Sequence, residues 1–438
     1  MTSKISRIFH GTLIHSLSLT ELEIIKDALV GVDEFGKIAF VEKEVLSEQT
    51  VNDILSEWEA TETKHAPQYP NAGTGLDVPL LEWLEKYTFP LEQLFSSLAF
   101  AEKTYPIVVS NLLRHGTTTA VYYATIHLES SKCLARIVHQ KGQRGFIGKV
   151  NMDRNSPETY IETTESSSKD TENFVKYVLD LDQQSRLVTP IITPRFAISC
   201  SSELMHSISE IAERYNVPIQ SHLSENDAEI AFVAELFSDP NYTSVYDNHK
   251  LLNNRTIMAH GIHLSPEERN LIKTRGAGIS HCPNSNFSLC SGVCNVRQLL
   301  DEGIKVGLGT DVSGGFSKTI LDSIRSASVA GKVTQMTAPK DKKSSPITLN
   351  ELFYLSTMGG ASLLNLENVI GNFEVGKEFD ALLIDPESHQ SPINLFEGID
   401  DDVERVFEKF LFLGDERNIL KVYVRGKMVS GTEYEGDC

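Results

Sequence analysis

The sequence repeats one arrangement four times: a short run of apolar or small residues that ends at a histidine or an aspartate. The runs are 217–222, 256–260, 277–281 and 306–311. Helix-like segments separate them, for example 265–274, which begins with the helix-start signature Ser-Pro-Glu-Glu. Strands that alternate with helices, each ending on a polar residue, are typical of a parallel α/β barrel or a doubly wound sheet. In both folds the active site lies at the carboxyl ends of the strands.

The first of these runs ends on His222, and a carboxylate follows at Glu225. A neutral imidazole is a good zinc ligand, and a carboxylate beside the metal can carry a proton to and from water. A single His-x-x-Glu is more often an ordinary surface or core pair than a catalytic site. Because the pattern recurs along the chain and closes on Asp311, it favours a metal-dependent active site.

The segment upstream continues the alternation of helices and strands. The predicted elements are helices at 95–114, 130–140 and 171–181 and strands at 117–123, 145–150 and 188–196. These strands and the four runs make seven, whereas a closed (β/α)8 barrel needs eight. The first should precede residue 65, but residues 45–62 are acidic, polar and helix-like. The sequence therefore predicts a TIM-type barrel whose first strand is missing.

Both ends of the chain have the pattern of β structure. The predicted segments are 6–14, 23–32 and 37–41 near the N-terminus and 374–385 and 421–429 near the C-terminus. Two terminal β segments around a central βα array predict one side domain, a small β-sandwich. The expected boundaries are 1–60 and 365–438 for the two parts of this side domain and 61–364 for the barrel.

Composition limits the partners of this chain. A formal net charge of -20 over 438 residues argues against nucleic acid and anionic membranes, because both carry negative charge. No window approaches 18 uninterrupted apolar residues, and the N-terminus lacks the apolar core of a signal peptide. We therefore expect a cytoplasmic protein that neither spans a membrane nor enters the secretory route.

Eight short motifs carry a resemblance to a known family. They are His65-Ala-Pro-Gln-Tyr-Pro-Asn, Arg114-His-Gly-Thr-Thr-Thr, Gly148-Lys-Val-Asn-Met-Asp, Pro194-Arg-Phe, Ser221-His-Leu-Ser-Glu, Ala259-His-Gly, Ser280-His-Cys-Pro-Asn-Ser-Asn and Leu308-Gly-Thr-Asp-Val-Ser-Gly-Gly. With these motifs the chain resembles the guanine deaminases of the amidohydrolase superfamily, those of the fungal type. The resemblance implies a (β/α)8 barrel with one zinc ion per chain, a β side domain and a homodimer.

The resemblance also implies a metal site and a reaction. His65, His222 and Asp311 are implied as zinc ligands, and Glu225 as the catalytic proton shuttle, with Asp311 helping to take the proton of water. The implied reaction is the hydrolysis of free guanine to xanthine and ammonia in purine catabolism. A free base needs no basic groove for a nucleic-acid strand, which agrees with the acidic chain.

Four further residues are implied to contact the substrate. Gln68, Arg195 and Phe196 are implied to hold the purine, and His260 to contact the substrate or the water near the metal. An arginine fork and an amide suit the carbonyl and ring nitrogens of guanine, and a phenyl ring can stack on its face. For His281 a structural role and a direct role are both open.

The sequence departs from the family pattern at the first strand. The family motif is roughly Pro-Gly-Phe-Ile-Asp-Thr-His-x-His-Ala-Pro, whereas this chain has Thr63 in the place of the first histidine and no apolar run before it. Strand counting and motif matching fail at the same place, which favours an internal deletion of a couple of dozen residues before Lys64. Lost support typically weakens metal affinity about 10- to 100-fold, so we predict weak zinc binding and slow turnover.

Three alternatives stay open. The first is an internally deleted, weakly active or inactive paralogue or isoform that binds purine. The second is an amidohydrolase that acts on another aminated heterocycle. The third is a binuclear hydrolase with a carboxylated Lys149. A nucleotide-binding module is disfavoured, because residues 310–315 lack the Lys-Ser/Thr of a phosphate-binding loop.

Overall fold

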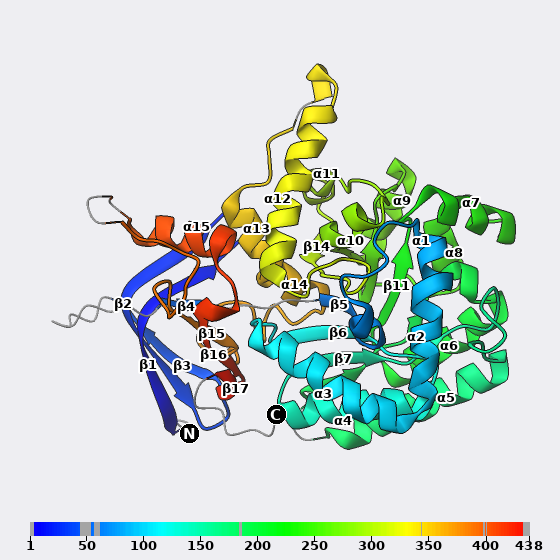
Figure 1. Ribbon diagram of the computed structural model, residues 1–438, viewed down its shortest axis with the longest axis horizontal. Coiled ribbons are helices and arrows are strands. Elements are labelled where there is room, and N and C mark those ends of the chain that lie inside the picture. The colour runs from blue at the N-terminus through cyan, green and yellow to red at the C-terminus, as the bar shows by residue number, and fades with distance from the viewer. Residues whose placement is uncertain are drawn as a thin grey trace.

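The computed structural model describes residues 4–43, 54–56, 62–183, 186–342, 344–396, 399 and 401–431. At its centre lie eight parallel strands in two sheets of four (Figure 1). They are β5 (Glu62–His65), β6 (Thr119–Tyr123), β7 (Arg144–Gly148) and β9 (Val188–Pro190) in one sheet and β11 (Ile219–Leu223), β12 (Thr256–His260), β13 (Gly278–His281) and β14 (Lys305–Leu308) in the other. A parallel bridge between Ile192 and Ile219 joins the two sheets. The strand order and the intervening helices confirm the predicted barrel class.

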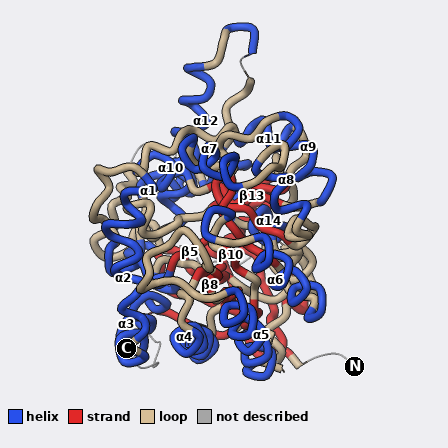
Figure 2. The backbone as a smooth tube through the Cα atoms, turned by 90° about the vertical axis from the view of Figure 1, so that its right-hand side faces the viewer, coloured by secondary structure: helices blue, strands red, loops and turns tan. Residues whose placement is uncertain are grey.

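Helices surround these strands, as Figure 2 shows. In chain order they are α1 (Leu80–Trp83), α2 (Phe89–Gln93), α3 (Leu98–Arg114), α4 (Leu128–Lys141), α5 (Thr164–Leu181), α6 (Ser202–Tyr215), α7 (Asp227–Leu236), α8 (Tyr242–Asn248), α9 (Pro266–Arg275), α10 (Pro283–Ser288), α11 (Val296–Asp301), α12 (Ile320–Thr337), α13 (Leu349–Ser356) and α14 (Met358–Leu363). Parallel strands need such crossovers, because each must return to the same edge before the next begins. None of the described helices combines the length and the apolar character needed to span a bilayer.

Local sequence signals set the limits of these helices. The Ser-Pro-Glu-Glu signature works as predicted: the Ser265 hydroxyl oxygen accepts a hydrogen bond from the Glu268 backbone N–H, and the Glu268 carboxylate accepts one from the Ser265 backbone N–H. Gly276 ends the same helix with a φ of 70°, a left-handed conformation that glycine adopts without strain.

The first barrel strand corrects one prediction. Residues Glu62–His65 form β5, which pairs parallel with β6 so that Glu62 lies opposite Ala120 and His65 opposite Tyr123. A four-residue strand thus occupies the place where we expected none, and the internal deletion before Lys64 stays a prediction. The sequence of this strand, Glu-Thr-Lys-His, carries no apolar run that a pattern could reveal. Lys64 is fully buried, and its ammonium donates to the Lys318 carbonyl at 3.2 Å.

A seven-stranded sheet lies beside the barrel and draws on both ends of the chain (Figure 1). In spatial order its strands are β17 (Lys427–Gly431), β16 (Ile419–Val424), β15 (Ala381–Ile384), β4 (Ile54–Ser56), β1 (Ile5–Ser16), β2 (Leu22–Asp33) and β3 (Ile38–Glu42). The side domain from both termini is thus present, although its described strands form one sheet where we expected a two-sheet sandwich. The domain boundaries at 60 and 364 stay a prediction.

The helix-like interpretation of residues 45–62 is also wrong where the structure describes them. Residues 54–56 form β4, which pairs parallel with β1 and antiparallel with β15, and Glu62 begins β5. Residues 44–53 and 57–61 lie outside the described part. Sheet pairing on both sides of β4 outweighs the local preference of its residues, which is how tertiary context often overrides propensity.

A buried charge cluster fastens the side sheet to the barrel. Arg144, at the start of β7, lies 2.8 Å from a Glu378 oxygen and 3.1 Å from an Asp380 oxygen. Arg425 reaches Glu378 from the other side at 2.7 Å. Arg144, Glu378 and Asp380 are buried, so removal of Arg144 would leave Asp380 as a buried charge without its arginine partner.

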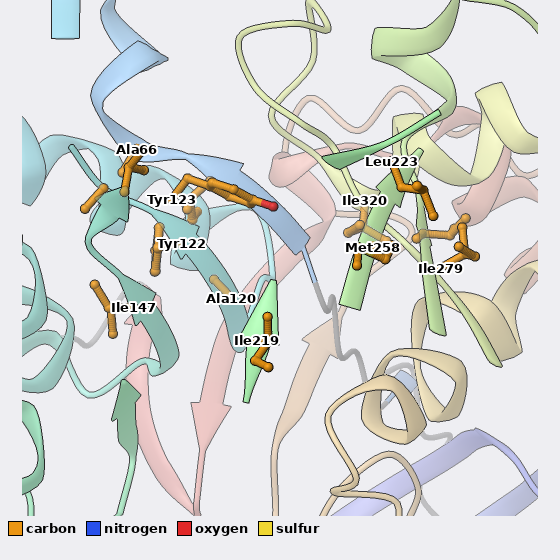
Figure 3. Close-up of a cluster of buried hydrophobic side chains, with 14 of the residues drawn as sticks. Ala66, Ala120, Tyr122, Tyr123, Ile147, Ile219, Leu223, Met258, Ile279 and Ile320 are labelled. Carbon is orange, nitrogen blue, oxygen red and sulfur yellow. The ribbon is translucent and has the colours of Figure 1, made fainter. Parts of the chain in front are cut away.

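Buried side chains from both four-stranded sheets belong to one hydrophobic core around the strands. Figure 3 shows Tyr123 and Ile147 from one sheet and Leu223, Met258 and Ile279 from the other. All five are at most 1% exposed. The barrel is therefore a packed core, and any reaction must take place above it, where the strands end.

Candidate metal and purine site

Three predicted ligands meet at the carboxyl ends of three strands. His65 ends β5, His222 lies on β11, and Asp311 follows β14. One ligand atom from each lies within 4.8 Å of the other two, and all three side chains are buried. The Nε2 atoms of His65 and His222 are 3.0 Å apart, and Asp311 Oδ1 lies 3.6 Å from His65 Nε2. Two imidazoles, one carboxylate and a water are a donor set that a catalytic zinc ion accepts.

Burial keeps the two imidazoles of this group neutral. Burial, with added repulsion from His260 and Arg195, lowers the pKa of His222 to about 3. Burial also lowers the pKa of His65 well below its usual value, and the neighbouring His222 adds to that effect. A neutral imidazole offers a lone pair to a cation, so both histidines are in the form that binds metal.

The two histidines differ in their outer contacts. His222 Nδ1 donates to the Arg195 carbonyl at 2.6 Å, which fixes the proton on Nδ1 and leaves the Nε2 lone pair facing the site. His65 Nδ1 is buried and has no hydrogen-bond partner among the described residues. Its ring is instead stacked on Tyr123, with the ring centres 4.5 Å apart. On its outer side the His65 ring is therefore held by packing.

A carboxylate and a third imidazole stand beside the three ligands. Glu225 Oε2 lies 3.3 Å from His260 Nε2, and Asp311 Oδ2 lies 3.8 Å from the same nitrogen. Ser291 donates to Glu225 Oε1 at 2.9 Å, and His260 Nδ1 donates to the Asn286 side-chain oxygen at 2.9 Å. Both carboxylates thus lie near the same nitrogen, His260 Nε2.

Burial shifts the pKa values of these acidic and basic groups. It raises the pKa of the Glu225 and Asp311 carboxyls, which His260 only partly offsets. Burial by itself would lower the pKa of His260, but the two carboxylates outweigh it and raise that pKa. A carboxyl with a raised pKa is suited to taking up and releasing a proton near neutral pH.

The backbone at these strand ends is unusual. His260 has a φ of 72° and Asp311 a φ of 49°, and Ser224, next to Glu225, has a φ of 48°. Residues other than glycine seldom adopt this left-handed region, and when they do they cluster at functional sites. The turns that follow β11, β12 and β14 therefore aim their side chains at the cost of local strain.

The four predicted substrate contacts line the same cavity as the ligands. The cavity is bordered by His65, Gln68, Leu80, Trp83, Leu84, Arg195, Phe196, His222, Glu225, Glu229, His260, Leu289 and Asp311. Its polar groups gather around the metal ligands and Arg195, while leucines, Trp83 and Phe196 supply apolar walls. Apolar walls with a few placed polar groups are the usual environment of a flat aromatic ligand.

Comparison with known proteins agrees with this geometry. Residues 64–429 match the model of the amidohydrolase family. The chain belongs to the amidohydrolase family. The guanine deaminase of Dictyostelium discoideum is 46% identical over 98% of this chain and 99% of its own length, and that of Mus musculus 48% identical over 98% and 97%. The solved guanine deaminase of C. acetobutylicum with bound guanine in the active site has a TM-score of 0.89 at 39% identity, covering 96% of this chain and 99% of that one.

The comparisons also bear on the start of this amidohydrolase barrel. The family match begins at Lys64, directly after the place where the motif is broken. The alignment with the Dictyostelium discoideum protein runs over 451 positions, more than the 438 residues of this chain. That alignment therefore contains positions that this amidohydrolase lacks.

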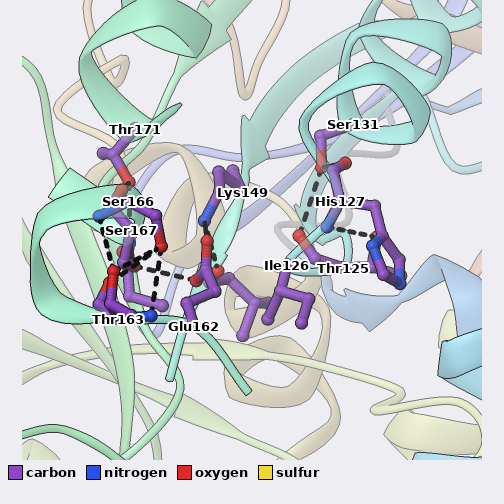
Figure 4. Close-up of polar contacts among 12 residues, drawn as sticks. Thr125, Ile126, His127, Ser131, Lys149, Glu162, Thr163, Ser166, Ser167 and Thr171 are labelled. Carbon is purple, nitrogen blue, oxygen red and sulfur yellow. Dashed lines mark hydrogen bonds and ion pairs between the residues drawn. The ribbon is translucent and has the colours of Figure 1, made fainter. Parts of the chain in front are cut away.

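Lys149 and His281, whose roles in the amidohydrolase the sequence left open, do not line the cavity. Lys149 is buried, and its ammonium donates to Glu162 at 2.7 Å and to the Val150 carbonyl at 3.1 Å (Figure 4). This ion pair leaves no support for the binuclear alternative with a carboxylated Lys149. His281 is fully buried, and burial together with His260 lowers its pKa to about 3.

Sequence reasoning missed two carboxylates of the amidohydrolase site. Glu229 accepts a hydrogen bond from the Glu225 backbone N–H at 2.8 Å, and burial together with Glu225 raises its pKa to about 7. Glu92, on α2, binds Arg195 with both oxygens at 2.6 and 3.1 Å. Burial alone would lower the pKa of the Arg195 guanidinium, but Glu92 outweighs it and raises that pKa. Neither glutamate lies in a motif, because each reaches the site only through the folded chain.

Proposed function

We propose that the chain is a guanine deaminase, which hydrolyses guanine to xanthine and ammonia. One observation carries the proposal: the His65, His222 and Asp311 group and the Arg195 and Gln68 pair open onto one cavity. The named relatives, similar over nearly the whole chain, are guanine deaminases, which supports the same substrate.

In this proposal His65, His222 and Asp311 hold one zinc ion per chain. When bound, the ion acts as a Lewis acid that brings the pKa of water toward neutrality. The donor set supports zinc, because it combines two neutral imidazoles with one carboxylate. Metal analysis of the purified protein after dialysis tests this assignment, and a tightly held ion other than zinc would contradict it.

Glu225 moves the protons of the proposed reaction. Its raised pKa and its place 3.3 Å from His260 support a carboxylate that takes a proton from water and then gives it to the leaving amine. Asp311 assists in taking the first proton. His260, whose pKa is raised by the two carboxylates, donates toward the negative charge that develops on the ring.

Arg195, Gln68 and Phe196 bind the base. The Arg195 fork and the Gln68 amide offer hydrogen bonds to the carbonyl and ring nitrogens of guanine, and Phe196 packs with the leucines of the wall. A fixed pattern of donors and acceptors rejects bases that cannot match it, since they would leave buried polar groups unpaired.

Ammonia release from guanine, adenine and cytosine tests the function. We expect release from guanine alone. Release from another base with guanine inert would favour the alternative of an amidohydrolase for a different heterocycle. A protein that binds guanine without turnover would favour the alternative of an internally deleted, inactive isoform.

We further propose a cytoplasmic homodimer that acts in guanine catabolism. A groove between α3 and residues 316–325 lies away from the ligand group, and Ile107 and Phe316 at its border are 54% and 60% exposed. Exposed apolar patches of this kind support a protein interface. Sedimentation analysis tests the dimer, and cell fractionation tests the location.

A further inference from the structure

The geometry points to Glu92 as a positioning residue of the purine site. We infer that its carboxylate locks both the Arg195 fork and the Gln68 amide in the arrangement that guanine requires. This inference rests on the proposed function, since it concerns how the same cavity selects its substrate.

The contacts of Glu92 saturate its carboxylate. Gln68 Nε2 and Arg195 Nη2 donate to Oε1 at 2.8 and 3.1 Å, and Arg195 Nη1 and the Tyr160 hydroxyl donate to Oε2 at 2.6 and 2.8 Å. The Glu92 side chain is 0% exposed. A carboxylate offers about four acceptor positions, so all of them are occupied by three side chains from separate segments.

Glu92 holds Arg195 in one orientation. The two parallel hydrogen bonds fix the plane of the guanidinium, and the Phe89 ring of the same helix lies beneath it with 5.0 Å between the guanidinium carbon and the ring centre. A buried arginine without a carboxylate would be an unpaired charge. The donors of Arg195 that Glu92 leaves free therefore keep a constant direction when the base enters.

Glu92 also decides which way the Gln68 amide faces. An ionised carboxylate can only accept hydrogen bonds, so Gln68 must turn its NH2 group toward Glu92. The Gln68 carbonyl oxygen is then free to accept from an N–H of the base. One carboxylate thus presents the ligand with a donor group and an acceptor group at the same time, which is the pairing that guanine needs.

Glu92→Gln tests this role with little change in volume. The substituted amide carries its own NH2 group, so it no longer forces the Gln68 amide to face one way, and it leaves Arg195 without a counter-charge. We expect the KM for guanine to rise about 10- to 100-fold while kcat of the folded, zinc-loaded enzyme falls much less, as for the loss of binding contacts. Tyr160→Phe removes one of the four hydrogen bonds and should raise KM only about 2- to 5-fold.

Glu378→Gln is the matched control. Glu378 is a buried carboxylate with two arginine partners, Arg144 and Arg425, but it belongs to the junction with the side sheet. This variant should lower the melting temperature and leave the KM for guanine unchanged. If Glu92 had a purely structural role, Glu92→Gln would likewise lower the melting temperature and leave the KM for guanine unchanged.

The outcomes separate this inference from the proposed function. Equilibrium binding of guanine by the full-length protein is measured beside turnover. A wild-type protein that neither binds nor converts guanine overturns the proposed function and the inference together. A wild-type protein that does either, with a folded Glu92→Gln variant whose KM or dissociation constant stays within twofold, overturns the inference about Glu92 alone.

Discussion

The two halves of the barrel contribute to the metal site in different ways. In the half formed by β11–β14, His222 lies on the buried strand β11 opposite Ala259 of β12, and its outer nitrogen donates to the Arg195 carbonyl. In the other half, His65 ends a four-residue polar strand, and its outer nitrogen has no partner among the described residues. The difference shows that the position of a metal ligand and the hydrogen bonding that holds the ligand in place are separate properties. The weaker half should limit the affinity of the whole site.

His222→Ala should have the largest effect on this comparison. It removes the best-supported ligand, so we expect zinc content at background level and no measurable deaminase activity. His65→Ala should also lower the zinc content, but by less, because the poorly supported His65 contributes less to the zinc affinity. Metal content and ammonia release, measured on both variants, check the order, and equal losses would contradict the difference between the two halves.

Glu225→Gln separates metal binding from proton transfer. We expect kcat to fall about 100- to 10,000-fold, the usual loss for a general acid–base group, with zinc content unchanged. The hydrogen bond from Ser291 to Oε1 can survive the change, since an amide oxygen accepts it as well. Loss of zinc in this variant would instead make Glu225 a ligand.

Thr63→His should strengthen the weaker half. Positions 63 and 65 are two apart on β5, and strand positions two apart share one face of a sheet. An added imidazole there restores the His-x-His pair of the family motif, and we expect zinc affinity to rise about 10- to 100-fold. A chelator competition assay measures it. An unchanged affinity would indicate that the length of β5, and not the missing histidine, limits the site.

Low pH should lower the stability of the β11–β14 half of the barrel, and we expect this effect to be the smallest of the four. In the metal-free protein His222 and His281 have pKa values of about 3, below the ordinary value of 6.5. The unfolded chain therefore takes up protons first as the pH falls, so stability present above pH 6.5 is lost progressively below it. Each histidine costs about 1.4 kcal/mol per pH unit in that window. Hydrogen exchange at β11 and β13 between pH 7 and 5 measures this loss, and constant protection would contradict it.

The same contrast explains what sequence could predict. The second half was predictable, because each strand is an apolar run that closes on a histidine or an aspartate, as at His260 and Asp311. β5 was not, because hydrogen bonds to β6, and not its own polar residues, make it a strand. Glu92 was not, because it lies in the short helix α2, outside every motif, and meets Arg195 only in the folded protein.

The spatial order of the side sheet has a consequence for biosynthesis. β4 lies between β1 and β15, so it can pair with β1 early in translation but receives its other neighbour only after the barrel, which separates β4 from β15 in the chain, has been synthesised. Until then β4 carries an open edge, the kind of surface to which chaperones and other nascent chains attach. Completion of this sheet is therefore a late step, which must wait until the chain of the barrel between its two parts has been made.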